Sequence, residues 1–292
     1  MLAACQSADP PVYRLASAET GGFFYEFAGL LSDATANADV GFRLERLVTL
    51  GTLQNLQFLR DGTVPLALAL SDATVADPQG LVALGRVYEN YLQVAVAGDS
   101  PIRRLEDLPG HRVSIGFPGS GTANSALRVL DAADIDPASF TQDPVPLVDL
   151  LDALATGRVE AGFFAGGVPN PLVDPVSGRG PASGVRILNL AGPLETLRAQ
   201  YGSVYQPVLV PAGVYGSTEE VETVGITSLV LATSALPDEV ADGLVEVLLT
   251  RPGELIPAAA LGAQYLSPSS LPYTFGVPLH PGAAAAYQRH HG

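Results

Sequence analysis

The sequence predicts an α/β fold of two lobes, and three observations lead to it. Apolar runs of strand length alternate with segments whose apolar residues have helical spacing, as in α/β proteins. The pattern Leu56-x-x-Leu59-x-x-Gly62-x-Val64 recurs as Leu151-x-x-Leu154-x-x-Gly157-x-Val159, so two similar units follow each other. With 292 residues, 47% of them hydrophobic, the chain is long enough to bury the cores of two lobes.

The first unit alternates strands and helices up to residue 97. Apolar residues alternate over 40–44, and the nearly continuous apolar run of 64–70 is typical of a strand buried on both faces of a parallel sheet. Thr52 is the expected N-cap of the second helix. We expect strands at 12–16, 40–44, 64–70, 81–87 and 91–97, and helices at 23–34 and 52–59.

The second unit repeats this order and leads back to the first. A short strand begins at Val113, and a helix carrying Leu127 and Leu130 follows a glycine-rich turn. Proline and glycine predict a surface loop over 171–184. Further strands are expected at 161–164, 185–190, 208–210 and 224–232, and helices at 194–201, 237–249 and 281–289.

These elements predict how the chain divides. Strands near Ala97 and Pro211 are expected to cross between the lobes, each lobe having its own sheet. The predicted divisions are a linker at 1–10, a first lobe made of 11–97 and 213–292, and a second lobe at 98–212. A ligand cleft is expected between the lobes.

The glycine-rich stretch 113–122 predicts an anion site. Its strand ends in a turn with three glycines, and Ser120 or Thr122 can cap the next helix, so free N–H groups point at one place. No lysine follows the turn as in a nucleotide-binding P-loop, and the Rossmann glycine spacing is absent. The alternative interpretation is an ordinary strand-to-helix turn.

Composition and motifs exclude other classes. With 30 acidic and 15 basic residues, the net charge of -15 argues against nucleic-acid binding. Ser120 lacks the Gly-x-Ser-x-Gly elbow of hydrolases, and the four histidines lack metal-site spacing, so the sequence predicts neither an enzyme nor a cofactor. An effector-binding or enzymatic domain on the same fold is the alternative.

The single cysteine, Cys5, follows Leu2-Ala3-Ala4 and matches a bacterial lipobox. We therefore expect lipidation at Cys5 and a location outside the cytoplasm, in the periplasm or at the outer face of the cytoplasmic membrane, with a chance match as the alternative. No apolar run reaches the length of a membrane span, so any membrane attachment would be through the lipid.

Several segments together resemble the TAXI-type solute-binding proteins of TRAP transporters, within the type II periplasmic-binding-protein superfamily. The resemblance covers nearly the whole chain, although the loop at 171–184 is richer in proline and glycine than the family pattern. The segments that carry it are 20–25, 51–56, 71–72, 105–122, 163–167, 211–215 and 278–283.

The resemblance implies a receptor that closes two lobes over a small anionic solute, such as glutamate or a dicarboxylic acid, and delivers it to a TRAP membrane subunit. Tyr25, Tyr205 and Tyr215 are either cleft aromatics or core residues. Asp72 either orients an ammonium group or a cation, or caps the turn after the buried strand. The candidate ligand contacts are Thr20, Gly21, Gly22, Tyr25, Thr52, Asn55, Ser71, Asp72, Pro118, Gly119, Ser120, Gly121, Thr122, Phe164, Gly166, Gly167 and Tyr215.

Overall fold

The computed structural model describes residues 9–174, 180–257 and 264–291. Cys5 therefore lies outside the described residues, as do residues 175–179 of the expected proline- and glycine-rich loop. Across the described part of the chain, no helix combines the length and the apolar character that a membrane span requires.

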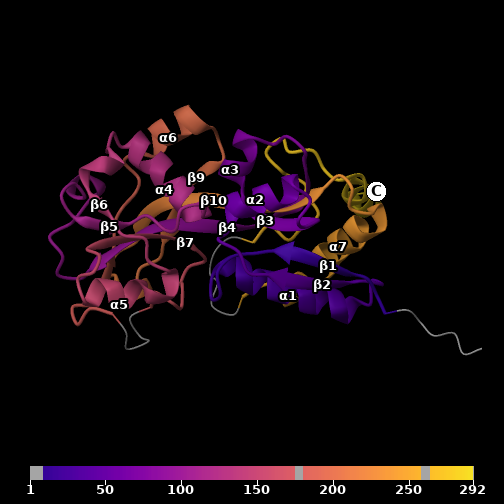
Figure 1. The fold of residues 1–292 in the computed structure, drawn as a ribbon, viewed down its shortest axis with the longest axis horizontal. Coiled ribbons are helices and arrows are strands. Elements are labelled where there is room, and N and C mark those ends of the chain that lie inside the picture. The colour runs from indigo at the N-terminus through magenta and orange to yellow at the C-terminus, as the bar shows by residue number, and fades with distance from the viewer. Residues whose placement is uncertain (1–8, 175–179, 258–263, 292) are drawn as a thin grey trace, which may run out of the picture.

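The chain forms two α/β halves that lie side by side (Figure 1). The first half holds β1 (Val12–Ala16), α1 (Phe23–Ala38), β2 (Arg43–Leu47), α2 (Thr52–Arg60), β3 (Leu66–Leu70), α3 (Ser71–Ala76), α7 (Asp238–Thr250) and α8 (Pro281–His291). The second half holds β5 (Arg112–Ser114), α4 (Gly121–Ala132), β6 (Thr141–Gln142), α5 (Leu150–Ala155), β7 (Ala161–Gly166), β8 (Val185–Ile187), α6 (Leu194–Tyr201) and β9 (Tyr205–Val210). Most predicted elements are confirmed with small shifts of their ends.

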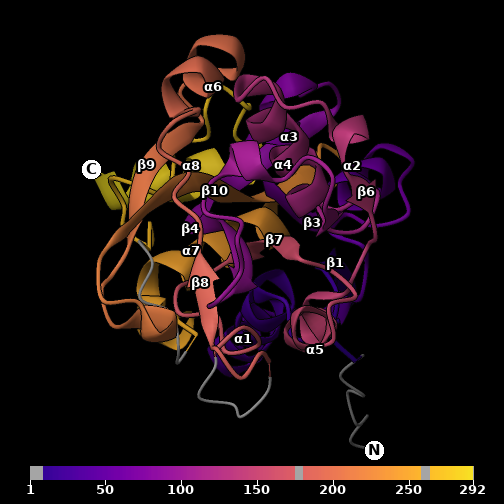
Figure 2. The ribbon, with the colours of Figure 1, turned by 90° about the vertical axis from the view of Figure 1, so that its left-hand side faces the viewer.

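Two long strands, β4 (Leu81–Ala97) and β10 (Val221–Thr233), run through both halves. They pair with each other in antiparallel orientation. On its other side β10 pairs with β3, and on its other side β4 pairs with β7. The strand order is β2-β1-β3-β10-β4-β7-β5-β6, with β8 on β4 and β9 on β10. Helices α3, α4 and α6 lie on one side of this sheet, and α1 and α5 lie on the other (Figure 2).

The expectation of a separate sheet in each lobe is therefore wrong. Strands 81–87 and 91–97 are one strand, because Glu89 and Asn90 between them are buried and bonded inside the structure rather than exposed in a turn. The passages between the halves lie inside β4 and β10 instead of near Ala97 and Pro211. The limits of the two lobes along the chain stay a prediction.

The repeated sequence pattern has the same structural role in both units. Gly62 follows α2 with φ 74° and Gly157 follows α5 with φ 69°, a left-handed conformation that glycine adopts without steric cost at a helix end. The apolar residues beside each glycine are buried: Val64 in the cluster with Leu56 and Leu59, and Val159 in the cluster with Leu151 and Leu154. Each glycine thus turns a helix back into the core.

The strand β3 shows how burial fixes the sheet. All five of its residues are buried, as its apolar run predicts. It pairs in parallel with β1 but in antiparallel with β10, so the parallel neighbours expected on both sides are present on one side only. Leu68 of β3 packs in the main core with Phe27 and Leu31 of α1. The carboxyl end of β3 thereby lies at the boundary between the two halves.

Candidate functional site

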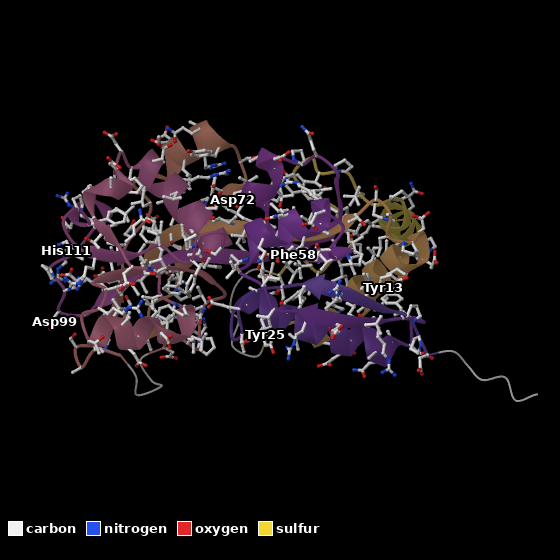
Figure 3. The ribbon with its side chains drawn as sticks, in the orientation of Figure 1. Tyr13, Tyr25, Phe58, Asp72, Asp99 and His111 are labelled. Atoms are coloured by element: carbon white, nitrogen blue, oxygen red, sulfur yellow. The ribbon has the colours of Figure 1, made fainter. Side chains whose placement is uncertain are left out.

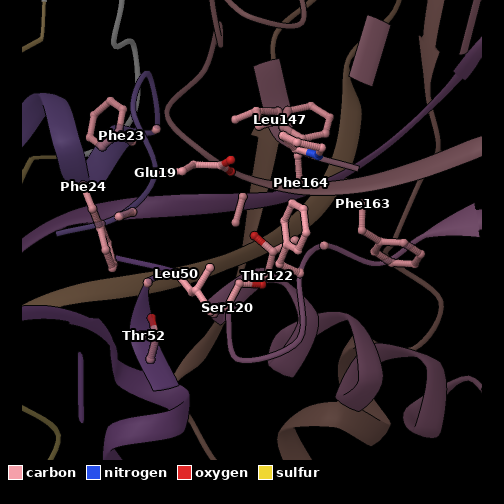
Figure 4. Close-up of a pocket in the computed structure, with 18 of the residues that line it drawn as sticks. Glu19, Phe23, Phe24, Leu50, Thr52, Ser120, Thr122, Leu147, Phe163 and Phe164 are labelled. Atoms are coloured by element: carbon pink, nitrogen blue, oxygen red, sulfur yellow. The ribbon is translucent and has the colours of Figure 1, made fainter. Parts of the chain in front are cut away.

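A cavity of about 180 Å³ lies between the two halves and takes its walls from both (Figure 4). The first half contributes the turn before α1 and the start of α2, and the second half contributes the turn before α4 and the segment that leads into α5. The lining residues are Ala18, Glu19, Gly22, Phe23, Phe24, Leu50, Gly51, Thr52, Leu70, Asn90, Gly116, Phe117, Ser120, Gly121, Thr122, Val145, Pro146, Leu147, Leu150, Phe163, Phe164 and Ala165.

The amino ends of helices α2 and α4 meet at this cavity. The Leu53 N–H of α2 donates to the Gly119 carbonyl oxygen before α4 at 3.2 Å, which joins the two halves directly. A Cβ atom added at Gly121 would lie 2.5 Å from Thr52 Oγ1 and 2.8 Å from Leu70 Cδ1. Glycine at this position is therefore what lets α4 approach α2 so closely.

Side chains hold both helix starts in place. Ser120 is the N-cap of α4, as predicted, and its Oγ accepts from the Ala123 N–H at 3.1 Å. The N-cap of α2 is Gly51, with φ 100°, and not Thr52 as the sequence predicts. Thr52 is the first helical residue, and its Oγ1 accepts from the Leu70 N–H at 3.1 Å, which fastens α2 to the end of β3.

Asn55 builds the loop before α2 and does not line the cavity. Its side chain is fully buried, and Nδ2 donates to the carbonyl oxygens of Ser17 and Leu68, at 2.7 Å each. Its Oδ1 accepts from Thr49 Oγ1 at 2.7 Å. Asn55 therefore ties β1, β3 and the loop together, and it acts on the cavity through the position of Gly51.

The cavity walls are largely apolar, with a few polar groups at the helix starts. Phe23 and Phe24 come from α1, while Phe163 and Phe164 come from β7 (Figure 4). Ser114 fixes part of the far wall, because its Oγ accepts from the Val145 N–H at 3.1 Å. Such a lining suits a solute with an apolar body and few polar groups.

Glu19 is the only ionisable side chain among the described residues that line the cavity. Burial raises the pKa of Glu19 above its ordinary value, and the charge of Asp149 adds to this rise, whereas an N–H bond from Leu147 opposes it. Leu147 belongs to the second half and Glu19 to the first. The carboxylate thus reaches across the line between the halves.

Six of the residues predicted from the sequence line the cavity together: Gly22, Thr52, Ser120, Gly121, Thr122 and Phe164. They come from loops far apart in the chain, so the fold brings the two glycine turns to one place. Thr122 also packs against its own turn, since a Cβ added at Gly116 would lie 3.1 Å from Thr122 Cβ.

Ser71 and Asp72 lie away from the cavity, on the α3 side of the sheet. Asp72 Oδ2 accepts from Ser125 Oγ at 2.7 Å, from Tyr205 OH at 2.9 Å and from Asn124 Nδ2 at 3.1 Å, so Asp72 joins α3 to elements of the second half. Figure 3 shows Asp72 between the halves. The buried Ser71 Oγ has no hydrogen-bond partner within the described residues.

Tyr25, Tyr205 and Tyr215 also lie outside the cavity lining. The guanidinium of Arg46 lies 3.8 Å from the ring centre of Tyr25, which places this ring on the outer side of α1 (Figure 3). Tyr215 is buried, and its OH accepts from the Asn170 N–H at 2.6 Å. Tyr215 supports the wall indirectly, because its ring packs edge-on against Phe164 at 6.5 Å.

The remaining predicted residues surround the cavity without lining it. Thr20 and Pro118 are exposed, and the Gly119 carbonyl oxygen accepts from the Leu53 N–H. The other glycines leave room for neighbours, since an added Cβ would lie 3.1 Å from Leu172 at Gly21, 3.0 Å from Asn170 at Gly166 and 2.5 Å from the Phe23 ring at Gly167.

Sequence reasoning missed Glu19, Asn90, the four phenylalanines other than Phe164 and the segment 145–147 as lining residues. Glu19 directly precedes the predicted turn, so a carboxylate beside a candidate ligand loop was a usable signal. Asn90 interrupts an apolar strand, and its Nδ2 contacts Ser228 Oγ of β10 in a short hydrogen bond. The segment 145–147 carries no signal, because only the fold brings it to the cavity.

No cluster of three or more metal-binding side chains occurs within the described ranges. The cavity also lacks an arginine, lysine or histidine among its described lining residues. Positive potential in it comes instead from the N–H groups at the starts of α2 and α4, which have no partner inside their own helices.

Comparison with known proteins agrees with this geometry. The sequence model of the NMT1-like family matches residues 15–290. A Xanthomonas citri protein bound to chloride ion is structurally similar, with a TM-score of 0.56, 16% identity and coverage of 95% of both chains. A putative L-cystine ABC transporter protein from Listeria monocytogenes has a TM-score of 0.54 and 13% identity, covering 84% of this chain and 92% of that one. The predicted α/β fold of two lobes with a cleft between them is confirmed.

Proposed function

The chain belongs to the NMT1-like family, and from this premise we propose that it is an extracytoplasmic solute-binding receptor that captures a small carboxylate. The lobes close over the solute in the cavity, and the receptor delivers it to a membrane subunit of the TRAP type. The TAXI-like segments of the sequence support this choice of transporter.

The observation that carries the proposal is the meeting of two helix starts from opposite halves at one cavity. The N–H groups of the first turn of a helix lack intrahelical partners, and the helix dipole places positive potential there. A carboxylate at the starts of α2 and α4 would accept from both halves at once. Ligand binding would thereby stabilise the closed arrangement of the lobes.

The polar groups of the cavity favour a receptor over an enzyme. A nucleophile would need an adjacent base, yet Ser120 Oγ is occupied as the helix cap and Thr52 Oγ1 accepts from a backbone N–H. These hydroxyl groups hold the helix starts in position. Their roles are structural. Because the N–H groups of Ala123 and Leu53 already donate to Ser120 Oγ and to the Gly119 carbonyl oxygen, the N–H groups left to contact the solute are those of Thr52, Gly121 and Thr122.

A thermal-shift screen of amino acids and organic acids tests the proposal. A carboxylate present at about 100 times its dissociation constant should stabilise the folded protein by about 2.7 kcal/mol. Sugars and simple amines serve as controls without a carboxylate. Stabilisation by these controls alone would show that the cavity does not select a carboxylate.

A further inference from the structure

We propose that Glu19 selects a solute with an ammonium group, so that the captured carboxylate is an α-amino acid with an apolar side chain. This inference rests on the proposed function, because it assigns the second polar contact of the same solute. It narrows the expectation of glutamate or a dicarboxylic acid that the resemblance implied.

The position of Glu19 carries the first step. Its carboxylate points into the cavity, toward Leu147 and Phe164, while Thr52, Ser120 and Thr122 lie on the opposite side of the view in Figure 4. In an α-amino acid the ammonium group is on the carbon next to the carboxylate. A solute whose carboxylate meets the helix starts can therefore turn its ammonium group toward Glu19 across the space.

The second step is that Glu19 has no basic partner among the residues that the structure describes. Within the described part of the chain, Glu19 forms no ion pair with an arginine or histidine, and the Leu147 N–H is a neutral donor. The nearby charge of Asp149 adds negative potential. A partly buried carboxylate without a countercharge is costly, and an ammonium group of the solute would offset this cost.

The third step concerns the rest of the solute. The remaining lining residues are mostly apolar, and they include Phe23, Phe24, Phe163, Phe164, Leu50 and Leu147. A second carboxylate on the solute would meet these apolar groups or Glu19 itself, with no basic side chain among the described lining residues to receive it. The cavity of about 180 Å³ therefore suits an aliphatic or aromatic side chain.

Matched ligands test this inference in isothermal titration calorimetry on dialysed protein. L-leucine is compared with 4-methylpentanoate, and L-phenylalanine with 3-phenylpropanoate, since each acid lacks only the ammonium group of its partner. We expect the amino acid of at least one pair to bind at least tenfold more tightly than its matched acid. L-glutamate and glutarate are expected to bind more weakly than that amino acid.

Variants then assign the effect to Glu19. Glu19→Gln should lower the affinity for the amino acid at least tenfold. The affinity for the matched acid should stay unchanged or rise. Glu45→Gln is the control, because this substitution removes the same charge from an exposed residue of β2. The comparison of ligand pairs in the unaltered protein needs no variant and stands even if Glu19→Gln fails to fold.

The outcomes separate the two proposals. If neither amino acid binds at least tenfold more tightly than its matched acid, or if glutarate or L-glutamate binds most tightly, the role of Glu19 is refuted and the carboxylate receptor stands. If no carboxylate among these probes and the screened acids binds, the proposed function itself is refuted. An affinity ratio that persists in folded Glu19→Gln would assign ammonium selection to another group.

Discussion

Gly121→Ala should weaken ligand binding by preventing the two halves from closing. The added Cβ would lie 2.5 Å from Thr52 Oγ1 and 3.1 Å from Thr52 Cβ, whereas ordinary contacts begin at 3.4 Å. Helix α4 would have to move away from α2 by about 1 Å to restore normal contact. The backbone at Gly121 is helical and α4 starts there, so alanine suits the local conformation.

The size of the effect follows from overpacking. Forcing an extra carbon into a close contact costs about 1–3 kcal/mol, and this strain acts mainly when the halves are closed on the ligand. The dissociation constant should therefore rise about 5- to 150-fold. Isothermal titration calorimetry with the carboxylate identified in the screen measures this change, after circular dichroism has shown that the variant folds.

Gly192→Ala is the matched control, because an added Cβ at Gly192 has no neighbour within 4 Å. It lies in the second half, between β8 and α6, and should bind with unchanged affinity. The larger Gly121→Val should weaken binding further than Gly121→Ala. If folded Gly121→Ala binds as tightly as the unaltered protein, the close approach of α2 and α4 plays no part in ligand capture.

Three other substitutions test features of the same structure. Ser120→Ala should lower the free energy of unfolding by about 1 kcal/mol in urea titration, because Ser120 caps α4; an unchanged stability would contradict that role. Burial raises the pKa of Glu89 from 4.5 to about 6. Between these two pH values the folded protein keeps a proton on Glu89 that the unfolded protein has lost. The contribution of Glu89 to the free energy of unfolding is therefore present below pH 4.5 and is lost as pH rises to about 6. This loss of about 2 kcal/mol should be absent from Glu89→Gln in urea titrations at pH 4.5 and 6.5; equal pH dependence of both proteins would refute it. Cys5→Ser should release the protein from membranes of a bacterial host, and unchanged partitioning would argue against lipidation at Cys5.

Local sequence patterns predicted most of the fold because each reports a local physical constraint. Gly62 and Gly157 occupy left-handed positions after helices, and the apolar run of β3 is buried throughout. The path of β4 was not predictable in this way. Glu89 is a charged residue that interrupts the apolar pattern. The hydroxyl groups of Tyr265 and Thr227, which donate to its carboxylate at 2.6 and 2.9 Å, and the pairing with β10 hold it inside a continuous strand.

The candidate site was predictable where it depends on backbone conformation. Glycine turns beside helix starts can be recognised locally, and Gly22, Ser120 and Gly121 do line the cavity. Side-chain roles were harder, because an asparagine or aspartate in such a turn has the same appearance whether it meets a ligand or the protein. Asn55 and Asp72 make protein contacts through residues that are distant in the sequence.

The paired strands β4 and β10 also restrict how the molecule can move. They are hydrogen-bonded from Val224 and Leu92 to Thr233 and Leu81, with register shifts between Ser228 and Leu229 and between Val230 and Leu231. A two-stranded ribbon resists bending within its own plane, since that would stretch its hydrogen bonds, but it accepts changes of twist, which bulges concentrate locally. Changes in the relative position of the halves should therefore occur more easily by twisting of these strands at the register shifts than by bending in the plane of the sheet.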